Sequence, residues 1–218
     1  MSGKLALWDW NGTLLDDVQY AINVRNCVFP RFGLPTVEDR SAYHEQFTFP
    51  VRVYYERAGV TEENFEAVAN AWMDEYVAGC HAVALFPDAL FALDRFAASG
   101  YAQVVLSASK LDTLRAQLQQ AGILERFDAV LGLSHIYATD KTEIAKDYFA
   151  ENKIKSADCV LLGDTVHDAL VADSLGIACA LIARGHMSRK RLQQTGKPVY
   201  ASLTEAAEAI LGRKTEPV

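Results

Sequence analysis

The chain has 218 residues, which is enough to bury a full hydrophobic core and long for one minimal domain. Half of its residues are apolar and 22% are charged, as in an ordinary globular protein. The formal net charge of −7, with no long basic run, argues against nucleic acid or an anionic membrane as the partner, so the expected ligand is small.

The sequence carries no pattern for export, membrane insertion or disulfide bonding. It lacks a basic segment followed by an apolar stretch and a small-residue cleavage site, and no apolar run approaches the roughly 20 residues of a membrane span. Its four cysteines lie far apart without a C-x-x-C pair, which signals neither a disulfide framework nor a zinc site. We expect a cytoplasmic protein that is a monomer or a homodimer.

The first strand is expected at residues 5–10, which run into the turn Asn11-Gly12-Thr13. Burying an unpaired charge at the end of such a strand is expensive, so Asp9 needs a partner. In parallel α/β sheets, ligands bind at the carboxyl ends of the strands, where an acid is well sited for metal or nucleophilic chemistry. An aspartate that only caps the next turn explains this segment, taken alone, equally well.

Residues 17–84 contain no convincing strand and several helical patterns. The clearest covers residues 62–76, where apolar side chains recur at helical spacing on one face. This pattern predicts a helical cap domain inserted at residues 17–84, directly after the first strand. Several cations of the insertion could face a ligand, and Arg52 is a candidate for substrate binding. The others are Arg25, Arg40, Arg57, His44 and His81.

From residue 85 onward, strand and helix patterns alternate, which is the signature of a parallel sheet with helices on its faces. We predict an α/β fold whose doubly wound parallel sheet, a Rossmann-like core, is formed by residues 1–16 and 85–218. After the first strand, four more are expected, at residues 102–106, 127–133, 159–162 and 177–183.

Polar side chains follow four of these strands, and in a parallel sheet they would meet at one edge. They are Asp9 and Asn11 after the first strand, Ser107 after the second, Lys141 near the start of the helix after the third, and Asp164 with Asp168 after the fourth. Each is weak evidence alone, since a serine after a strand usually caps a helix and a lone lysine is usually solvated. Their occurrence together, in sheet order, is hard to assign to accident.

This set of residues fits phosphoryl transfer through a covalent aspartyl intermediate. A carboxylate that attacks an anionic phosphoryl group needs the charge repulsion cancelled, which a divalent metal held by Asp9 and Asp164 would do. Magnesium suits such a site because it prefers hard oxygen ligands and keeps several waters. Lys141 and the Ser107 hydroxyl can hold the phosphoryl oxygens, and Thr13 with the backbone amides of its turn can add donors.

Four segments carry a resemblance to a known family: DWNGT at residues 9–13, VVLSAS around Ser107, Lys141, and GDTVHD at residues 163–168. In this order they resemble the four motifs of the haloacid dehalogenase-like hydrolase superfamily. The insertion resembles the helical cap of that superfamily's phosphoglycolate phosphatase-like type, which closes over the substrate and sets specificity. Two further lysines, Lys110 and Lys146, are rivals for the place of Lys141.

The resemblance implies roles for several residues. Asp9 would be the nucleophile, Asp164 a magnesium ligand and Asp168 a supporting acid of the metal site. The main-chain carbonyl of Asn11 would be another metal ligand. The resemblance also implies that the first strand lies at the centre of the sheet.

Two further residues are weaker candidates for the site. His186, in the loop after the fifth strand, is a softer candidate for the rim of the site, although a surface position is favoured. Trp10 is a candidate for the wall of the pocket.

Asn11 departs from the family pattern. The family's phosphomonoesterases usually have an aspartate two residues beyond the nucleophile, which protonates the leaving alcohol and then activates water. Asparagine can form hydrogen bonds but cannot exchange a proton at neutral pH. General acid–base catalysis contributes about 10²- to 10⁴-fold, so we expect a phosphatase that is slow or biased to good leaving groups.

Several alternatives remain open. Asn11 could be a substitution that was introduced into the chain. Alternatively, it could be converted to aspartate later, since Asn-Gly sequences are prone to deamidation. It could be a catalytically weak homologue that binds a phosphorylated ligand or a protein. A phosphonate hydrolase is disfavoured because residues 18–84 contain no lysine, and a metal-free dehalogenase because GDTVHD supplies two acids. A receiver-like domain without hydrolase activity is disfavoured by the insertion.

Overall fold

The protein, described here by a computed structural model for residues 3–137 and 140–212, is built on a six-stranded sheet in the order β3-β2-β1-β4-β5-β6. Every neighbouring pair is parallel, and β1 lies between β2 and β4. The predicted doubly wound α/β class is confirmed. The strands are β1 (Lys4–Trp8), β2 (Tyr101–Lys110), β3 (Ala129–Leu133), β4 (Cys159–Gly163), β5 (Ala178–Ile182) and β6 (Val199–Tyr200).

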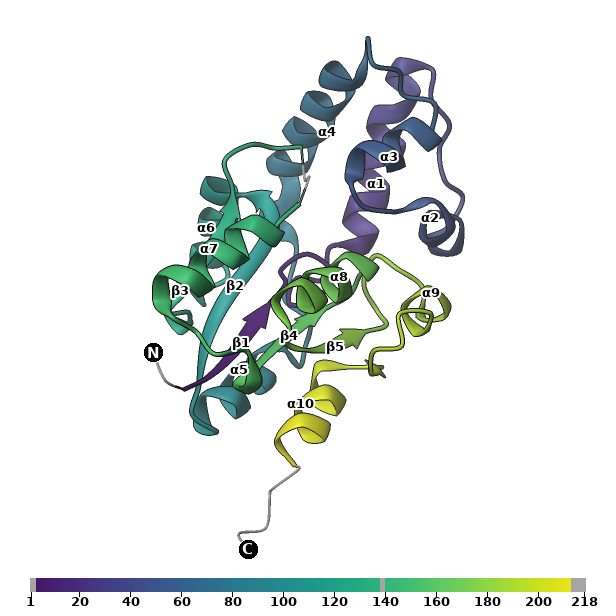
Figure 1. The fold of residues 1–218 in the computed structure, drawn as a ribbon. Coiled ribbons are helices and arrows are strands. Elements are labelled where there is room, and N and C mark those ends of the chain that lie inside the picture. Colours follow the sequence, from purple (N-terminus) through teal and green to yellow (C-terminus); the bar gives the residue numbers. More distant parts are fainter. Residues whose placement is uncertain (1–2, 138–139, 213–218) are drawn as a thin grey trace, which may run out of the picture.

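Helices cover both faces of the sheet (Figure 1). Side chains of a strand alternate between faces, so Leu5 and Leu7 of β1 pack in one hydrophobic cluster and Ala6 and Trp8 in another. The first cluster includes residues of α7 (Thr142–Asn152), α8 (Val166–Leu175) and α9 (Arg189–Gln193). The second includes residues of α5 (Ala89–Ala98), α6 (Leu111–Gln120) and α10 (Leu203–Leu211). Short 3-10 turns are η1 (Phe29–Phe32), η2 (Cys80–Ala82), η3 (Leu124–Arg126) and η4 (Ser156–Asp158).

Four helices between β1 and α5 lie together at the top of Figure 1, beyond the carboxyl edge of the sheet. They are α1 (Val18–Val28), α2 (Arg40–Gln46), α3 (Val51–Arg57) and α4 (Phe65–Gly79). Aromatic side chains fill their interior, where Phe29 meets Tyr55 edge to face with ring centroids 5.6 Å apart. The predicted helical cap is confirmed as part of the fold, and residues 17–84 contain no strand. The exact division into 17–84 and 1–16 with 85–218 stays a prediction, and residues 1–2, 138–139 and 213–218 lie outside the described ranges.

The largest differences from the predicted strands concern β1, β2 and β6. β1 ends at Trp8 because the carbonyl of Trp10 already accepts bonds from the turn that follows. β2 continues to Lys110, which pairs with Leu133 of β3 after a shift in register, so Ser107 lies inside this strand. β6 was not predicted, because a strand of two residues carries no readable alternation.

Within the described ranges, the helices all fall short of the length and apolar character that crossing a bilayer requires.

Candidate active site

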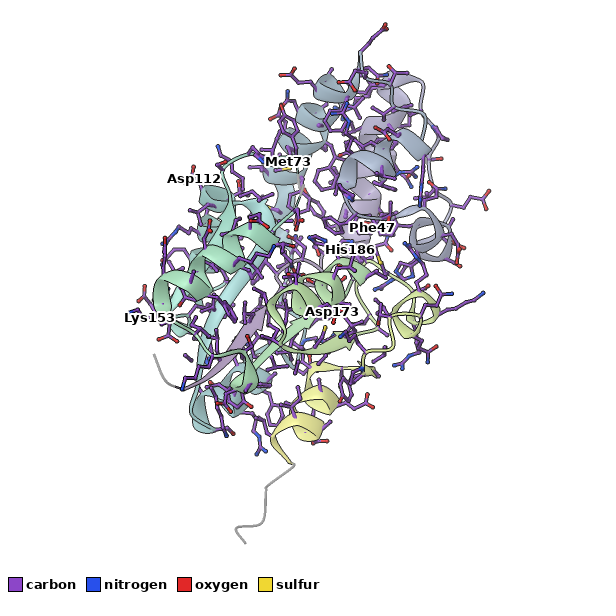
Figure 2. The ribbon with its side chains drawn as sticks, viewed as in Figure 1. Phe47, Met73, Asp112, Lys153, Asp173 and His186 are labelled. Carbon is purple, nitrogen blue, oxygen red and sulfur yellow. The ribbon has the colours of Figure 1, made fainter. Side chains whose placement is uncertain are left out.

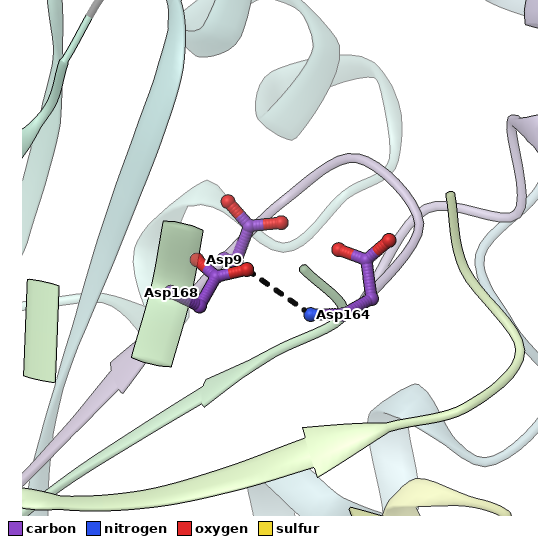
Figure 3. A group of neighbouring side chains, drawn as sticks. All are labelled: Asp9, Asp164 and Asp168. Atoms are coloured by element: carbon purple, nitrogen blue, oxygen red, sulfur yellow. Dashed lines mark hydrogen bonds between the residues drawn. The ribbon is translucent and has the colours of Figure 1, made fainter. Parts of the chain in front are cut away.

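The carboxylates of three acids gather where β1 and β4 end side by side (Figure 3). Asp9 directly follows β1, and its backbone N–H donates to the carbonyl of Leu162 in β4 at 2.9 Å. Asp164 directly follows β4, and Asp168 comes from the first turn of α8. Ligand oxygens of Asp9, Asp164 and Asp168 all lie within 4.8 Å of one another. Residues more than 150 positions apart therefore form one acidic cluster, because their strands are neighbours in the sheet.

Lys141 is the cation of this cluster. It lies at the start of α7, is 2% exposed, and forms ion pairs with Asp9 and with Asp168, the latter at 2.7 Å. Its ammonium group also donates to the carbonyl of Leu106 in β2 at 3.1 Å. All three N–H donors of the ammonium thus have partners in the site, which fixes Lys141 beside Asp9.

The two rival lysines lie elsewhere. Lys110 lines the pocket, but its side chain is 41% exposed and lies 3.9 Å from Asp112. Lys146 is exposed on α7 and pairs with Glu143 at 2.8 Å. The structure brings Lys141 to Asp9 and does so for neither rival.

Asp168 supports the site from α8. Its Oδ2 accepts bonds from the backbone N–H of Thr165 at 3.0 Å, from the Thr165 hydroxyl at 2.6 Å, and from the backbone N–H of Asp164 at 3.2 Å, the dashed line of Figure 3. Thr165 and Asp168 form a capping box at the start of the helix. Burial raises the pKa of Asp168, but Lys141 and Thr165 outweigh it and hold the pKa below its usual value. Asp168 is a fixed anion that positions Lys141.

The other two acids resist ionisation. Burial raises the pKa of Asp9 to about 6, with Lys141 opposing the shift. Burial also raises the pKa of Asp164 well above its usual value, with His186 opposing it. Among the described residues, no lysine or arginine pairs with Asp164. Three buried carboxylates against one ammonium leave the cluster with excess negative charge, which a divalent cation with a preference for oxygen ligands would balance.

Two glycines, Gly12 and Gly185, lie too close to the Asp164 carboxylate to carry a side chain. Gly12 has φ +73°, in the left-handed region, and a Cβ placed there would overlap Asp164 and His186. A Cβ on Gly185 would also overlap Asp164. The loops after β1 and β5 therefore approach this carboxylate with bare backbone, and the backbone N–H of His186 donates to it at 2.5 Å.

Asn11 is fully used in hydrogen bonds. Its amide nitrogen donates to Asp17 at 2.7 Å and lies 2.9 Å from the hydroxyl of Tyr76 on α4. Its side-chain oxygen accepts from the hydroxyl of Ser109 in β2 at 2.8 Å. The side chain predicted as the departure from the family pattern thus connects the first loop, the cap and the sheet.

Asp17 is a functional candidate that the sequence prediction missed. The residue is 1% exposed and precedes α1, yet its side chain makes no capping bond to that helix. Instead it accepts from the backbone N–H of Gly12 at 2.8 Å and from Tyr76 at 2.8 Å, and lies 3.2 Å from His186 Nε2. Burial raises its pKa, but His186 outweighs that effect, so the pKa lies below its usual value. The only signal in the sequence was an acid before a helix, which normally indicates a cap.

His186 is buried, so the surface position favoured from the sequence is wrong. Its ring lies beside that of Phe47, with centroids 5.1 Å apart, where the cap meets the core (Figure 2). Its Nδ1 lies 2.8 Å from the hydroxyl of Tyr43 on α2. Burial lowers the pKa of His186, but the carboxylates of Asp17 and Asp164 outweigh it and raise the pKa above its usual value. The polar loop around His186 did not indicate this burial, because the groups that cover the ring come from distant segments, the first loop and the cap.

Two hydroxyl side chains are close to the acids: Thr13 lies against the acidic cluster, and Ser107 lines the pocket above it. The Thr13 hydroxyl lies 3.3 Å from Asp9 and 3.1 Å from Asp164. Ser107 is buried and lines the pocket, and its hydroxyl accepts from the backbone N–H of Ser109 at 3.1 Å. The Ser107 proton stays available to a ligand oxygen.

Arg52 and Trp10 are not brought to the pocket. The Arg52 side chain is 41% exposed, pairs with Glu62 and stacks over Phe65 at 4.6 Å. Trp10 is buried in the core and donates to Gln117 at 2.8 Å. Neither belongs to the side chains that line the pocket.

Asp9, Asp164 and Lys141 form the floor of a cavity of about 150 Å³, roofed by the cap. A cavity of this size admits a small metabolite and excludes a folded macromolecule. Its walls combine the polar residues of the sheet edge with aromatic side chains of α2, α3, α4 and the loops between them, and with one aromatic residue from the segment that follows β3. The aromatic lining residues are Tyr43, Phe47, Phe49, Tyr54, Tyr55, Phe65, Trp72, Tyr76 and Tyr137.

Lys141→Met is expected to destabilise the protein by about 3–5 kcal/mol at about pH 8, because it leaves two buried carboxylates, Asp9 and Asp168, without their cation. Both acids would then have pKa values above those of the unfolded chain, so the loss grows as the pH rises above about 4 and is smaller at about pH 5. Urea unfolding at the two pH values measures it. Lys146→Met removes only an exposed pair and is expected to change nothing measurable at either pH. Equal free energies of unfolding in Lys141→Met and wild type would contradict this arrangement.

Comparisons with known proteins identify a family. The model of a family described as haloacid dehalogenase-like hydrolase matches residues 6–182. "Probable phosphatase IndB" of Dickeya dadantii is 24% identical over 230 residues, covering 98% of this chain and 97% of that protein. A phosphoglycolate phosphatase of Synechococcus elongatus is 22% identical over 186 residues, covering 85% of this chain and 86% of that protein.

Solved structures share the fold at low sequence identity. A haloacid dehalogenase-like hydrolase from Streptococcus pneumoniae superposes with a TM-score of 0.82 at 18% identity, covering 95% of this chain and 98% of that chain. The resemblance inferred from the four motifs is therefore confirmed. Since the family model spans well over half of the sequence, the chain belongs to the haloacid dehalogenase-like hydrolase family.

Proposed function

We propose that this hydrolase is a magnesium-dependent phosphatase of small phosphorylated metabolites, which acts through an aspartyl-phosphate formed on Asp9. One observation carries the proposal: Asp9, Asp164 and Lys141 meet, buried, on the floor of a pocket of metabolite size. A carboxylate nucleophile, a second acid for a metal and a fixed cation are the groups that transfer of a phosphoryl group requires.

In the first step, a carboxylate oxygen of Asp9 attacks phosphorus, and the bond from phosphorus to the leaving oxygen breaks. Lys141 holds the phosphoryl oxygens from one side, and the Ser107 hydroxyl donates to them from β2. In the second step, water attacks the phosphoryl group, which releases inorganic phosphate and restores the Asp9 carboxylate. Magnesium, held by Asp9, Asp164 and the carbonyl of Asn11, would supply the positive charge that lets two anions meet.

Asn11 sets the expected substrate preference. Its amide is bonded to Asp17, Tyr76 and Ser109 and has no proton to give at neutral pH. The leaving oxygen must then depart without a proton from this position. The enzyme is accordingly slow on alkyl esters and faster on substrates whose leaving group is already a stable anion.

The relatives support phosphate ester chemistry, since the two named above are described as phosphatases. At 24% and 22% identity they do not carry a substrate over to this chain. The cytoplasmic location, the monomeric or homodimeric state and the lack of nucleic-acid and membrane partners stay predictions from the sequence.

The test measures inorganic phosphate released from alkyl esters, acyl phosphates and pyrophosphate, with magnesium and with excess EDTA. We expect release only with magnesium, and about 10²- to 10⁴-fold faster from acyl phosphates than from alkyl esters, because a carboxylate leaving group needs no proton. Release that is unaffected by EDTA would contradict the metal site. If no compound turns over but one raises the melting temperature in a magnesium-dependent way, the chain is instead a phospho-ligand binding module.

A further inference from the structure

Arg25 is a buried cation in the cap. It lies on α1, is 1% exposed and lines the same pocket as Asp9 and Lys141. Its guanidinium stacks over the ring of Phe29 at 4.7 Å and lies 5.7 Å from the ring of Tyr54. These rings hold the plane of the guanidinium in place.

Most of its hydrogen-bonding capacity is unused. Nη2 donates to the side chain of Gln46 at 2.9 Å, whereas Nε and Nη1 have no partner within the described residues. No carboxylate of the described ranges forms an ion pair with Arg25, and both nitrogens are shielded from bulk water. A guanidinium with free donors in such a place is unfavourable unless something brings it acceptors.

The other cations of the pocket already have anionic partners. Lys141 is paired with Asp9 and Asp168, and Lys110 lies near Asp112 with much of its side chain in water. Of the described lysines and arginines that line the pocket, Arg25 alone has no acid beside it. The acidic cluster is on the floor and Arg25 is on the cap side, so a molecule that fills the pocket would present its far end to Arg25.

We infer that Arg25 binds a second anionic group on the substrate, a carboxylate or a second phosphate, at the end remote from the phosphoryl group that Asp9 attacks. The inference rests on the proposed function and narrows it to phosphate esters with two anionic ends. The buried side chain of Tyr54 lies beside this guanidinium, and its hydroxyl is a second donor for the same anion. Burial raises the pKa of Tyr54, with Arg25 opposing the shift, so this hydroxyl keeps its proton at neutral pH.

The test compares compounds that differ only at the remote end. Phosphoglycolate carries a carboxylate there, ethylene glycol bisphosphate carries a phosphate, and ethyl phosphate carries a methyl group. In the wild type we expect kcat/KM to be about 10- to 100-fold higher for one or both of the doubly anionic compounds than for ethyl phosphate. Which of the two gains more identifies the anion.

Arg25→Met keeps an apolar stem and removes the charge. It is expected to bring kcat/KM for the doubly anionic compounds down to that for ethyl phosphate, while the value for ethyl phosphate stays within about threefold of wild type. Arg25→Lys keeps the charge without the planar fork and is expected to give an intermediate ratio. The matched control is Arg31→Met, because Arg31 is an exposed cap arginine that pairs with Glu75 at 2.7 Å, and its ratio is expected to equal that of wild type.

Two results would overturn the inference. The first is a wild-type kcat/KM for the doubly anionic compounds that is about equal to that for ethyl phosphate. The second is an equal loss of kcat/KM for all three compounds in Arg25→Met. If Arg25→Met does not fold, an unchanged ratio in Arg25→Lys overturns it and a reduced ratio supports it. All three compounds are alkyl esters, which this enzyme is expected to hydrolyse slowly, so the proposed function fails only if acyl phosphates and pyrophosphate are not hydrolysed either. If none of the three compounds releases phosphate, thermal shifts decide the inference. Phosphoglycolate or the bisphosphate would then raise the wild-type melting temperature more than ethyl phosphate does, and equal shifts would reject the role of Arg25.

Discussion

Asp9→Asn is expected to lower phosphate release by about 10⁶-fold, the loss seen when a covalent nucleophile is removed from an enzyme. The amide cannot attack phosphorus at a useful rate, and the remaining groups of the pocket can only bind the substrate. The measurement is inorganic phosphate released with magnesium from the best substrate of the panel. Activity equal to wild type would reject the covalent mechanism.

The fold is expected to survive this substitution. Burial raises the pKa of Asp9 to about 6, so the carboxylate is a strained anion in the metal-free protein, and an uncharged amide of the same size relieves that strain. Lys141 keeps Asp168 as its partner at 2.7 Å. Circular dichroism and thermal unfolding check this point. Asp173→Asn is the matched control, because Asp173 is an exposed residue near the end of α8 that pairs with Lys197, and this variant is expected to keep full activity.

A second measurement examines the intermediate directly. Rapid acid quench of the wild type with an acyl phosphate substrate should give protein heavier by one phosphoryl group, because the aspartyl-phosphate is stable in acid. Peptide mapping should place the added mass on residues 4–17 and remove it after treatment with hydroxylamine. Asp9→Asn should carry no added mass.

Asn11→Asp is expected to raise turnover of alkyl phosphate esters by about 10²- to 10⁴-fold, the contribution of general acid–base catalysis. Asn11 Nδ2 now lies 2.7 Å from Asp17, so the substitution sets one carboxylate against another. Two carboxylates at that separation share a proton, and the pKa of one of them rises. The pair is thus protonated near neutral pH and can supply the proton that the leaving alcohol needs.

The double substitution Asn11→Asp with Asp17→Asn is the matched control. In this double variant the carboxylate is at position 11 and the amide at position 17. A neutral amide therefore still donates to a carboxylate across this contact. We expect the gain in both proteins if the proton comes from position 11, and only in the single variant if it comes from the shared pair. No gain in either would mean that the proton is handled elsewhere, and acyl phosphates, which need no proton, should show little change in all variants.

Deamidation has to be excluded in these experiments, because Asn-Gly sequences convert to aspartate with age. The backbone nitrogen that must attack the Asn11 side chain is that of Gly12, and it is already bonded to Asp17 at 2.8 Å. We therefore expect slow conversion in the folded protein. Intact mass and peptide mapping of fresh and aged wild type measure it directly.

The fold could be inferred from the sequence because its signals are local. The alternation of strand and helix after residue 85 follows from hydrophobic periodicity, and the insertion was visible because residues 17–84 have helical periodicity only. The strand ends were harder to predict. β2 continues past Ser107 only because Leu133 of the neighbouring strand pairs with Lys110, a partner that no local pattern reveals.

Some residues of the site could be predicted from the sequence and others could not. Asp9, Asp164 and Lys141 were predictable from their positions after strands, because parallel strands end at one edge. Asp17 was not, since an acid before a helix normally caps it and here it bonds to Gly12 and Tyr76 instead. Arg52 was chosen among the cap cations without any signal to separate it from Arg25.

The sequence of this hydrolase by itself determined its family, its sheet and the acids at the floor of the pocket. Short motifs indicate the family and the acids, and hydrophobic periodicity indicates the strands of the sheet. The tertiary structure alone decided which cap residues face those acids. Within the cap, Phe29, Tyr54 and Gln46 pack around the buried Arg25, α4 brings Tyr76 to Asn11, and Tyr43 and Phe47 lie against His186. Burial depends on neighbours that are distant in the chain, and it is burial that turns an ordinary arginine or histidine into a group with a strong need for a partner.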